Sequence, residues 1–257
     1  MVEALKRDKV VVVLGAGFSY HAGLPIQNNF MKELKRQKRT ERIQSEFQKV
    51  HDFFHKYVGT RIEHYSIEDL FTILDKCIMD EESYRTANVA KIEGVYDAFL
   101  TSIRDFVKFK VTKALTATVR LRIYDRLLQP IADGVKNENG PHVSVISLNW
   151  DHLFESRIRR LTTESGYIAL DYGVEDQSFG RGHLPSLQSS QPGRLPFLKL
   201  HGSSNWGECP NCHTLYISFG QRMTRAANEP GARFKCMTTR CDVDLTPVII
   251  TPTFLKE

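Results

Sequence analysis

Apolar residues form short continuous runs at four places in the chain, and each run predicts a strand. The clearest are KVVVVL at 9–14 and VSVISL at 143–148, and shorter runs follow at 197–200 and 247–251. Continuous β-branched runs of this length are expected for strands buried on both faces of a parallel sheet. The first run leads into a glycine-containing loop and a helix that we expect to start near Asn28. This order predicts the opening of a nucleotide-binding α/β fold.

Between about 40 and 129 the apolar residues change to helical spacing. Ile67, Leu70, Phe71 and Leu74, for example, recur every three or four residues. This period predicts a helical insertion. A further helix is expected from about 151 to 161, whereas the Gly-, Ser- and Pro-rich stretch 171–196 predicts an irregular surface loop.

The cysteines add a metal site to this picture. Cys209 and Cys212 form one close pair, Cys236 and Cys241 form another, and 23 residues separate the pairs. Two such knuckles can bring four sulfurs to about 2.3 Å from one tetrahedral Zn²⁺. The alternative is two disulfides or four free thiols, although disulfide frameworks belong mostly to short secreted chains. The spacing predicts a structural zinc ribbon, and the separate Cys77 is expected to be a buried helical cysteine.

The predicted organisation is a single α/β domain over residues 1–257, with a parallel sheet, a helical insertion and a small zinc-ribbon module. The sheet core takes residues 8–40, 141–205 and 245–257. The insertion takes residues 41–132 and the zinc-ribbon module residues 206–244. A chain of 257 residues with 41% hydrophobic content can bury the core that this fold needs.

Charge and hydropathy limit the kinds of partner that the sequence predicts. No apolar run is long enough for a signal-peptide core or a membrane span, so the sequence predicts a cytoplasmic protein without a membrane partner. The net charge of +5 falls to about +3 if four thiolates hold zinc. That balance argues against a nucleic-acid partner. The densest basic stretch, 32–42, predicts a solvated helix face because Glu33 and Glu41 lie within it.

Polar motifs follow three of the predicted strands. The first is GAGFS at 15–19, where Gly15 and Gly17 allow a tight turn and close approach to a pyrophosphate. Tyr20 occupies the third glycine position of a G-x-G-x-x-G fingerprint, so the ordinary dehydrogenase loop is not matched. A strand-to-helix turn without a ligand is the alternative.

The other two motifs follow the strands at 143–148 and 197–200. Asn149 offers a donor and an acceptor where open α/β sheets bind ligands, and Asp151 either contacts the ligand or caps the next helix. A lone His201 would usually be structural, but imidazole suits proton transfer near neutral pH. The glycine beside it, Gly202, would permit a substrate to approach closely.

Taken in order, GAGFS at 15–19, LNWD at 148–151, LHG at 200–202 and the four cysteines resemble the sirtuin superfamily. The resemblance implies a Rossmann-like NAD⁺ domain, a smaller module with a structural zinc, and cleavage of the bond between nicotinamide and ribose. It gives the phosphate-binding loop to Gly15, Ala16, Gly17 and Ser19. It implies that Asn149 and Asp151 bind the nicotinamide ribose. It also implies that His201 is catalytic, with Asn149 orienting the ribose and the water. The implied zinc ligands are Cys209, Cys212, Cys236 and Cys241.

The amino-acid sequences of the motifs are most similar to those of the divergent SIR2-like branch found in bacterial antiviral defence proteins. Protein-deacylating sirtuins follow the glycine loop with a Gly-Ile-Pro-Asp-Phe-Arg type segment, whereas residues 23–28 here read GLPIQN. Many defence members hydrolyse NAD⁺ to nicotinamide and ADP-ribose, which is the activity that this resemblance implies.

Three other functions stay open. A zinc knuckle is less usual in the defence branch, which keeps an NAD⁺-dependent lysine deacylase as the first alternative. A non-catalytic NAD⁺ or ADP-ribose sensor is the second. A nucleic-acid-binding zinc ribbon is a weaker third, and it would have to use Arg222, Arg225, Arg233, Lys235 and Arg240.

The resemblance also bears on assembly. Sirtuin-like folds continue through further strands that bind the adenosine half of NAD⁺, whereas this sequence stops six residues after Thr251. The C-terminal part of the fold is therefore expected to be missing. A homo-oligomer, an additional C-terminal region or a partner protein is expected to complete the site.

Overall fold

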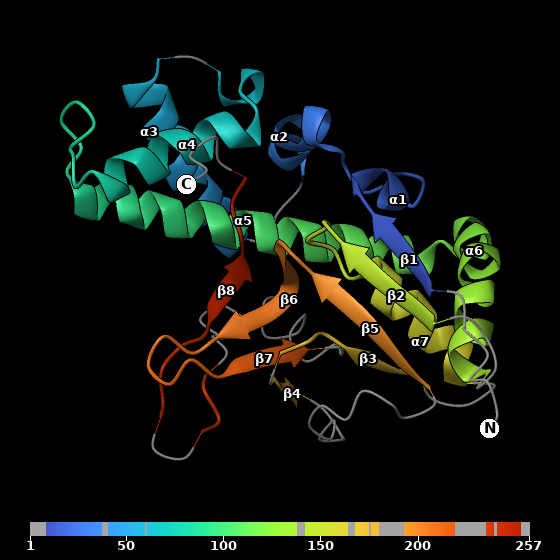
Figure 1. The fold of residues 1–257 in the computed structure, drawn as a ribbon. Coiled ribbons are helices and arrows are strands. Elements are labelled where there is room, and N and C mark those ends of the chain that lie inside the picture. Colours follow the sequence, from blue (N-terminus) through green and yellow to red (C-terminus); the bar gives the residue numbers. More distant parts are fainter. Residues whose placement is uncertain are drawn as a thin grey trace.

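The fold is that of a computed structural model. It describes residues 9–37, 41–59, 61–137, 142–163, 168–174, 176–179, 193–218, 235–238 and 241–252. Figure 1 shows the described elements, with a long helix running between a group of helices and two sheets.

The first sheet is parallel and has four strands. They are β1 (Lys9–Leu14), β2 (His142–Ser147), β3 (Ala169–Asp171) and β5 (Arg194–Lys199), in the spatial order β1-β2-β5-β3. Strands were expected at three of these places, and the parallel arrangement confirms that part of the prediction. In Figure 1 the carboxyl ends of β1, β2 and β5 point towards the long helix.

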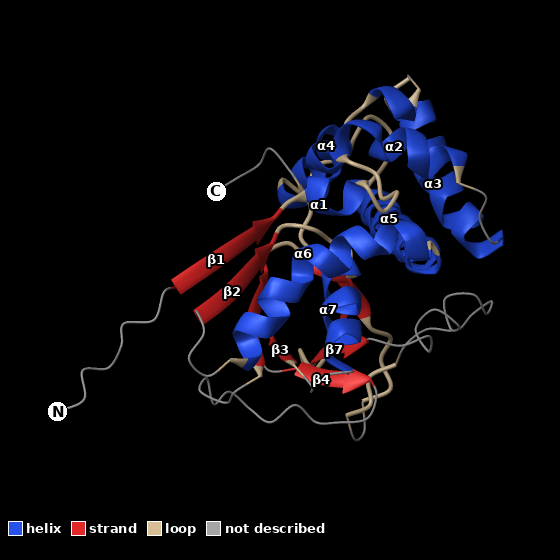
Figure 2. Cartoon of the chain, turned by 90° about the vertical axis from the view of Figure 1, so that its right-hand side faces the viewer, coloured by secondary structure: helices blue, strands red, loops and turns tan. Residues whose placement is uncertain are grey.

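Two helices cover only one face of this sheet. They are α6 (Thr118–Lys136) and α7 (Leu153–Thr163), and α7 confirms the helix expected after Asp151 (Figure 2). Side chains on the covered face, such as Val145 and Phe197, are 0% exposed.

The expectation that the first strand is buried on both faces is wrong. β1 is an edge strand, and Val11 and Val13 are 59% and 61% exposed. Their register partners on β2 are Ser144 and Ile146, so the exposed valines belong to the face opposite α6 and α7. An apolar run identifies a strand, but it does not specify how many of its faces are covered.

Residues 41–132 are mostly helical, as the apolar spacing predicted, although α6 at the end of this stretch packs on the parallel sheet. The helices before α6 are α1 (Ala16–Tyr20), α2 (Gln27–Arg36), α3 (Glu41–Tyr57), the 3₁₀ helix η1 (Ile62–His64), α4 (Ile67–Met79) and α5 (Val89–Thr116). Ser66 starts α4 in a capping box, because its hydroxyl accepts from the Asp69 amide while the Asp69 carboxylate accepts from the Ser66 amide. Cys77 lies on α4 as expected, but it is half-buried rather than fully buried.

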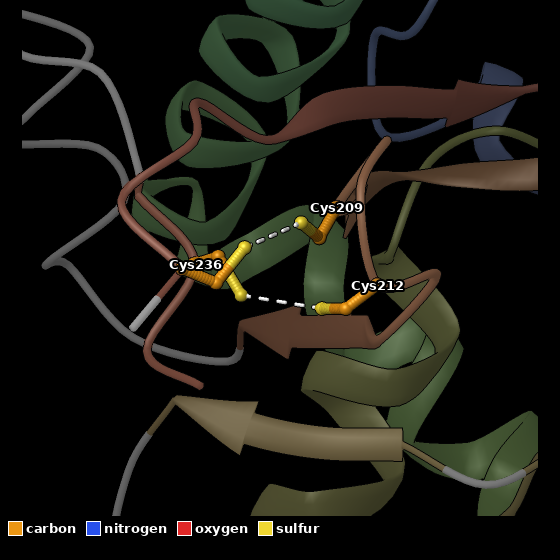
Figure 3. Close-up of side chains that lie close together, drawn as sticks. Cys209, Cys212 and Cys236 are labelled. Carbon is orange, nitrogen blue, oxygen red and sulfur yellow. Dashed lines mark hydrogen bonds between the residues drawn. The ribbon is translucent and has the colours of Figure 1, made fainter. Parts of the chain in front are cut away.

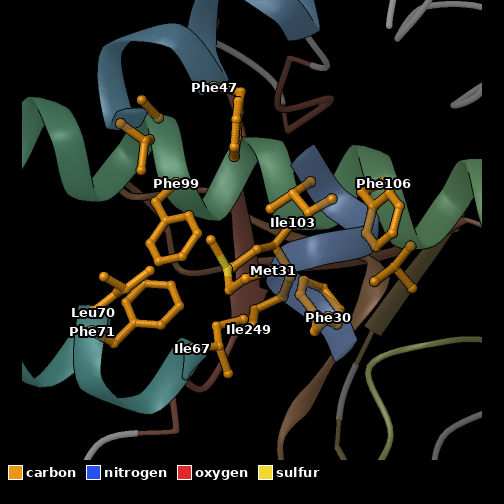
Figure 4. Packing of buried hydrophobic residues seen from close by; sticks show 14 of the residues in the cluster. Phe30, Met31, Phe47, Ile67, Leu70, Phe71, Phe99, Ile103, Phe106 and Ile249 are labelled. Carbon is orange, nitrogen blue, oxygen red and sulfur yellow. The ribbon is translucent and has the colours of Figure 1, made fainter. Parts of the chain in front are cut away.

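The core of the insertion is continuous with the second sheet. Buried side chains from α2, α4 and α5 point towards one another and surround Ile249, as Figure 4 shows. Phe71 and Phe99 stack at 4.5 Å between ring centroids, and Phe30 meets Phe106 edge to face at 5.2 Å. The insertion is thus packed onto the strands rather than attached by a linker.

The second sheet has the order β4-β7-β6-β8. It consists of β4 (Asp176–Phe179), β6 (Gly202–Glu208), β7 (Leu215–Ser218) and β8 (Thr246–Ile249). Two features differ from expectation. The strand predicted at 247–251 pairs antiparallel with β6 instead of joining the parallel sheet, and part of the expected loop 171–196 forms β4 and the start of β5.

Candidate functional site

The polar motifs meet at the carboxyl edge of the parallel sheet. Gly15 follows β1, Asn149 follows β2, and His201 follows β5. Because these strands are neighbours and parallel, three segments that lie far apart in the sequence come together. The structure therefore assembles the residues that the sequence singled out.

The glycine loop and the segment at 149–151 are joined by two side-chain hydrogen bonds. The Asn149 amide donates to the carbonyl oxygen of Gly15 at 2.9 Å, and the Ser19 hydroxyl donates to Asp151 Oδ2 at 2.8 Å. Asn149, Ser19 and Asp151 are all buried. These side chains hold the two loops against each other.

Asp151 also caps α7, as the structural alternative predicted. Its Oδ1 accepts from the amide of Leu153 at 2.9 Å, while Oδ2 is held by Ser19. Both carboxylate oxygens thus have protein partners. The cap is confirmed, and a contact between Asp151 and a ribose stays a prediction.

The two loop glycines face open space. A Cβ atom added to Gly15 or Gly17 would meet no heavy atom within 4 Å. Gly15 is the N-cap of α1 with an extended φ of −107°, so it does not need the left-handed conformation either. The packing of the described residues does not explain why glycine stands at these two positions.

His201 presents one ring nitrogen to solvent. Its side chain is exposed, and Nδ1 lies 3.1 Å from the carbonyl oxygen of Leu148. Since a carbonyl only accepts, this contact places the proton of the neutral ring on Nδ1 and leaves a lone pair on Nε2. The geometry suits a proton acceptor.

The neighbouring Gly202 has a structural role, and the close approach of a substrate at this residue stays a prediction. Its φ is +69°, and an added Cβ would lie 2.2 Å from the carbonyl oxygen of Val248. Glycine is required here because β8 passes directly over the backbone.

Lys199 and Glu155 form a buried pair behind the site that the sequence interpretation missed. Lys199 Nζ lies 3.1 Å from Glu155 Oε1, and the two side chains are 0% and 1% exposed. Burial raises the pKa of Glu155, although the charge of Lys199 opposes that shift. Strand alternation was the available signal, since Lys199 falls on the same face as the buried Leu195 and Phe197.

The four predicted zinc ligands converge at one end of the second sheet. The sulfurs of Cys209, Cys212, Cys236 and Cys241 all lie within 4.8 Å of one another. Figure 3 shows three of them, labelled, pointing towards one another from the turn between β6 and β7 and from the segment before β8. The sulfurs of Cys209 and Cys241 are 3.5 Å apart, as are those of Cys212 and Cys236.

These distances fit a metal better than disulfides. A disulfide brings two sulfurs to about 2.0 Å, whereas ligands about 2.3 Å from a tetrahedral zinc are separated by roughly 3.8 Å. All four cysteines are unbridged. A hydrogen bond from the Thr214 hydroxyl, 3.2 Å from the sulfur, lowers the pKa of Cys212 to about 6, whereas burial raises the pKa of Cys209 to about 11. The support for a metal site therefore comes from the sulfur–sulfur distances. The four cysteines could hold a metal such as zinc.

Most of the basic residues predicted for a nucleic-acid-binding zinc ribbon fall outside the described part of the chain. Of the arginines and lysine expected near the zinc ribbon, only Lys235 lies within the described residues, where it pairs with Asp242; Arg222, Arg225, Arg233 and Arg240 lie outside them. Among the described helices, none combines the length and apolar character needed to cross a membrane.

No protein-family model matches the chain, and a search of curated proteins finds no match.

Proposed function

We propose that the chain is the catalytic part of an NAD⁺ glycohydrolase that yields nicotinamide and ADP-ribose. One observation carries the proposal. The glycine loop, Asn149 and His201 meet at the carboxyl edge of a parallel sheet, and Asn149 contacts Gly15 directly at 2.9 Å. These motifs carry the resemblance to the SIR2-like branch. They are adjacent in space, as residues of one site must be.

The proposed reaction replaces one bond at the anomeric carbon of the nicotinamide ribose. The carbon–nitrogen bond breaks, and its electron pair neutralises the pyridinium nitrogen, so nicotinamide leaves without an acid. Water forms the new carbon–oxygen bond and gives up one proton. Catalysis therefore depends on stabilising a cationic sugar and on placing the water.

Each residue has a defined part in this mechanism. The backbone at Gly15 and Gly17 leaves space for the phosphates. Asn149 orients the ribose and the water through the part of its amide that Gly15 does not use. His201 accepts the proton at Nε2, and such general-base assistance is worth about 10²- to 10⁴-fold. Since both oxygens of Asp151 are engaged, we assign it to holding the loop.

Zinc has a structural part in this proposal. Four thiolates fill a tetrahedral shell and leave no open position for water. The cysteines lie at one end of the second sheet, where Cys209 follows β6, so the metal would stabilise the strand that begins beside His201.

The exposed face of the parallel sheet supports the expectation of a further region or partner. Parallel sheets are normally covered on both faces, and here Val11, Val13 and Leu198 lie exposed opposite α6 and α7. We propose that a homo-oligomer, an additional C-terminal region or a partner protein covers this face and completes the NAD⁺ site.

An NAD⁺-dependent lysine deacylase is the second candidate, and the cysteine cluster is the observation that favours it. The geometry of the four sulfurs matches the structural zinc that the resemblance associates with deacylating sirtuins more than with the defence branch. Against it stands the segment 23–28, which lacks the aromatic residue that shields the reacting centre in deacylases.

Product identification separates these functions. Purified full-length protein is incubated with NAD⁺, with and without an acyl-lysine peptide, and the products are resolved by liquid chromatography and mass spectrometry. A glycohydrolase releases nicotinamide and ADP-ribose without peptide, and His201→Ala abolishes most of that release. O-acyl-ADP-ribose that forms only with peptide would identify a deacylase, and tight NAD⁺ binding without turnover would identify a sensor.

A further inference from the structure

Lys199 joins the two strand ends that carry the proposed site. It is the last residue of β5, and its side chain turns to the covered face of the sheet, where it is 0% exposed. Nζ donates to the carbonyl oxygen of Asp151 at 2.5 Å and to Glu155 Oε1 at 3.1 Å. One ammonium group thereby connects β5, the loop after β2 and helix α7.

Two neighbouring hydrogen bonds connect the same segments. The amide of Leu200 donates to the carbonyl oxygen of Ser147 at 3.1 Å, and His201 Nδ1 donates to that of Leu148. With Lys199, the end of β5 thus holds the segment 147–151 at three carbonyl oxygens. Asn149 lies between the points of attachment, so its position depends on them.

A role in stability alone does not explain a charged pair at this place. Replacing a buried ion pair by apolar side chains of similar size is often neutral or stabilising, because both charges must lose their hydration. The pair is also incompletely satisfied, since Glu155 Oε2 has no hydrogen-bond partner among the described residues. What apolar residues could not supply is the donor to the Asp151 carbonyl.

We propose that Lys199 is a positioning residue: its ammonium fixes the loop that bears Asn149 relative to His201, and Glu155 compensates the buried charge of Lys199. The catalytic part of this inference rests on the proposed NAD⁺ hydrolysis. Lys199 acts through the loop and does not touch the substrate.

Two variants of the full-length protein separate positioning from stability. Lys199→Met with Glu155→Leu removes both buried charges, which is often stabilising, and the donor to the Asp151 carbonyl, which is destabilising, so we expect a Tm close to that of the wild type. kcat for nicotinamide release should nevertheless fall by about 100-fold, because misplacing a reacting group by about 1 Å can have that effect. Glu155→Gln keeps Lys199 on the Asp151 carbonyl but leaves its charge unpaired, so Tm should fall while kcat stays near the wild-type value.

A second ion pair on α7, in which Arg157 is 3% and Asp125 31% exposed, provides the control. Arg157 Nε donates to Asp125 Oδ1 at 3.0 Å between α7 and α6, away from the loop. Arg157→Met with Asp125→Leu should leave both kcat and KM unchanged. A wild-type kcat in folded Lys199→Met/Glu155→Leu would overturn the inference, as would an equal loss of kcat in the control.

Trp150 gives a readout that does not depend on activity. The chain has only two tryptophans, so Trp206→Phe leaves Trp150 as the single fluorescence reporter. Trp150 lies in the segment 147–151 that Lys199 holds. In that background, Lys199→Met/Glu155→Leu should change the emission maximum and iodide quenching of Trp150, and the Arg157/Asp125 control should not. If the wild type releases no nicotinamide, the proposed function fails, yet a change in Trp150 fluorescence would still show that Lys199 positions the loop. Trp150 fluorescence that is the same in both proteins would overturn the positioning role of Lys199, whatever the activity.

Discussion

The side-chain amide of Asn149 donates to the carbonyl oxygen of Gly15, joining two strand ends that lie 134 residues apart in the sequence. The contact is 2.9 Å long, and Asn149 is only 8% exposed. Whatever binds at this edge of the sheet meets the glycine loop and the Asn149 loop as one surface.

Asn149→Ala should therefore reduce both stability and activity. The Gly15 carbonyl would lose the Asn149 donor but keep the Phe18 amide, so the free energy of unfolding should fall by about 0.5–1.5 kcal/mol. If Asn149 also orients the ribose, kcat for nicotinamide release should fall by about 100-fold. Urea unfolding and nicotinamide release measure the two effects.

Ser19→Ala is the matched control, because it removes the parallel bond from Ser19 to Asp151 between the same two segments. It should cost similar stability but reduce kcat much less. Equal losses of kcat in the two variants would show that the Asn149 amide does no more than join the loops.

Gly15→Ala and Gly17→Ala should separate folding from ligand binding. An added Cβ meets nothing within 4 Å at either position, so the free energy of unfolding should change by no more than about 1 kcal/mol. The methyl group would occupy the space that we assign to the phosphates, so KM for NAD⁺ should rise in both variants. Gly202→Ala should instead unfold the protein, because its Cβ would lie 2.2 Å from the Val248 carbonyl. NAD⁺ affinity unchanged in both loop variants would argue against a phosphate site.

The sequence predicted the local elements better than their surroundings. The valine run at 9–14 forms β1, but the exposure of Val11 depends on which elements cover that face, and no local pattern carries this. Likewise, β8 forms where expected, yet its antiparallel pairing with β6 depends on contacts with a distant segment. The pattern of apolar residues along β8 does not predict its partner strand. The cysteine cluster was predictable because the spacing within each cysteine pair is local. The Lys199–Glu155 pair joins residues 44 positions apart, and only the inward position of Lys199 signalled it.

Removing the metal should destabilise the fold before it affects the chemistry. Cys209 is 0% exposed and lies between β6 and β7, so Cys209→Ser or a chelator should lower Tm and release zinc, measured by plasma mass spectrometry. Cys77→Ser serves as the control, because Cys77 lies on α4 outside the cluster and its loss should leave the zinc content unchanged. Thermal unfolding that is indifferent to chelation would contradict a structural metal.

His152 should make stability depend on pH on the acidic side of neutrality. Loss of solvation, with the positive charges of Lys199 and Lys108, lowers its pKa to about 3 in the folded protein, against about 6.5 in an unfolded chain. Between these values the unfolded state binds more protons, so this contribution is fully present above pH 6.5 and is lost as the pH falls towards 3, by up to about 1.4 kcal/mol per pH unit. His152→Gln keeps a polar group near Ser204, 3.4 Å from the ring in the wild type, and should flatten the dependence measured by urea unfolding between pH 7 and pH 5. Equal slopes in the two proteins would show that His152 is protonated as readily in the folded state as in the unfolded one.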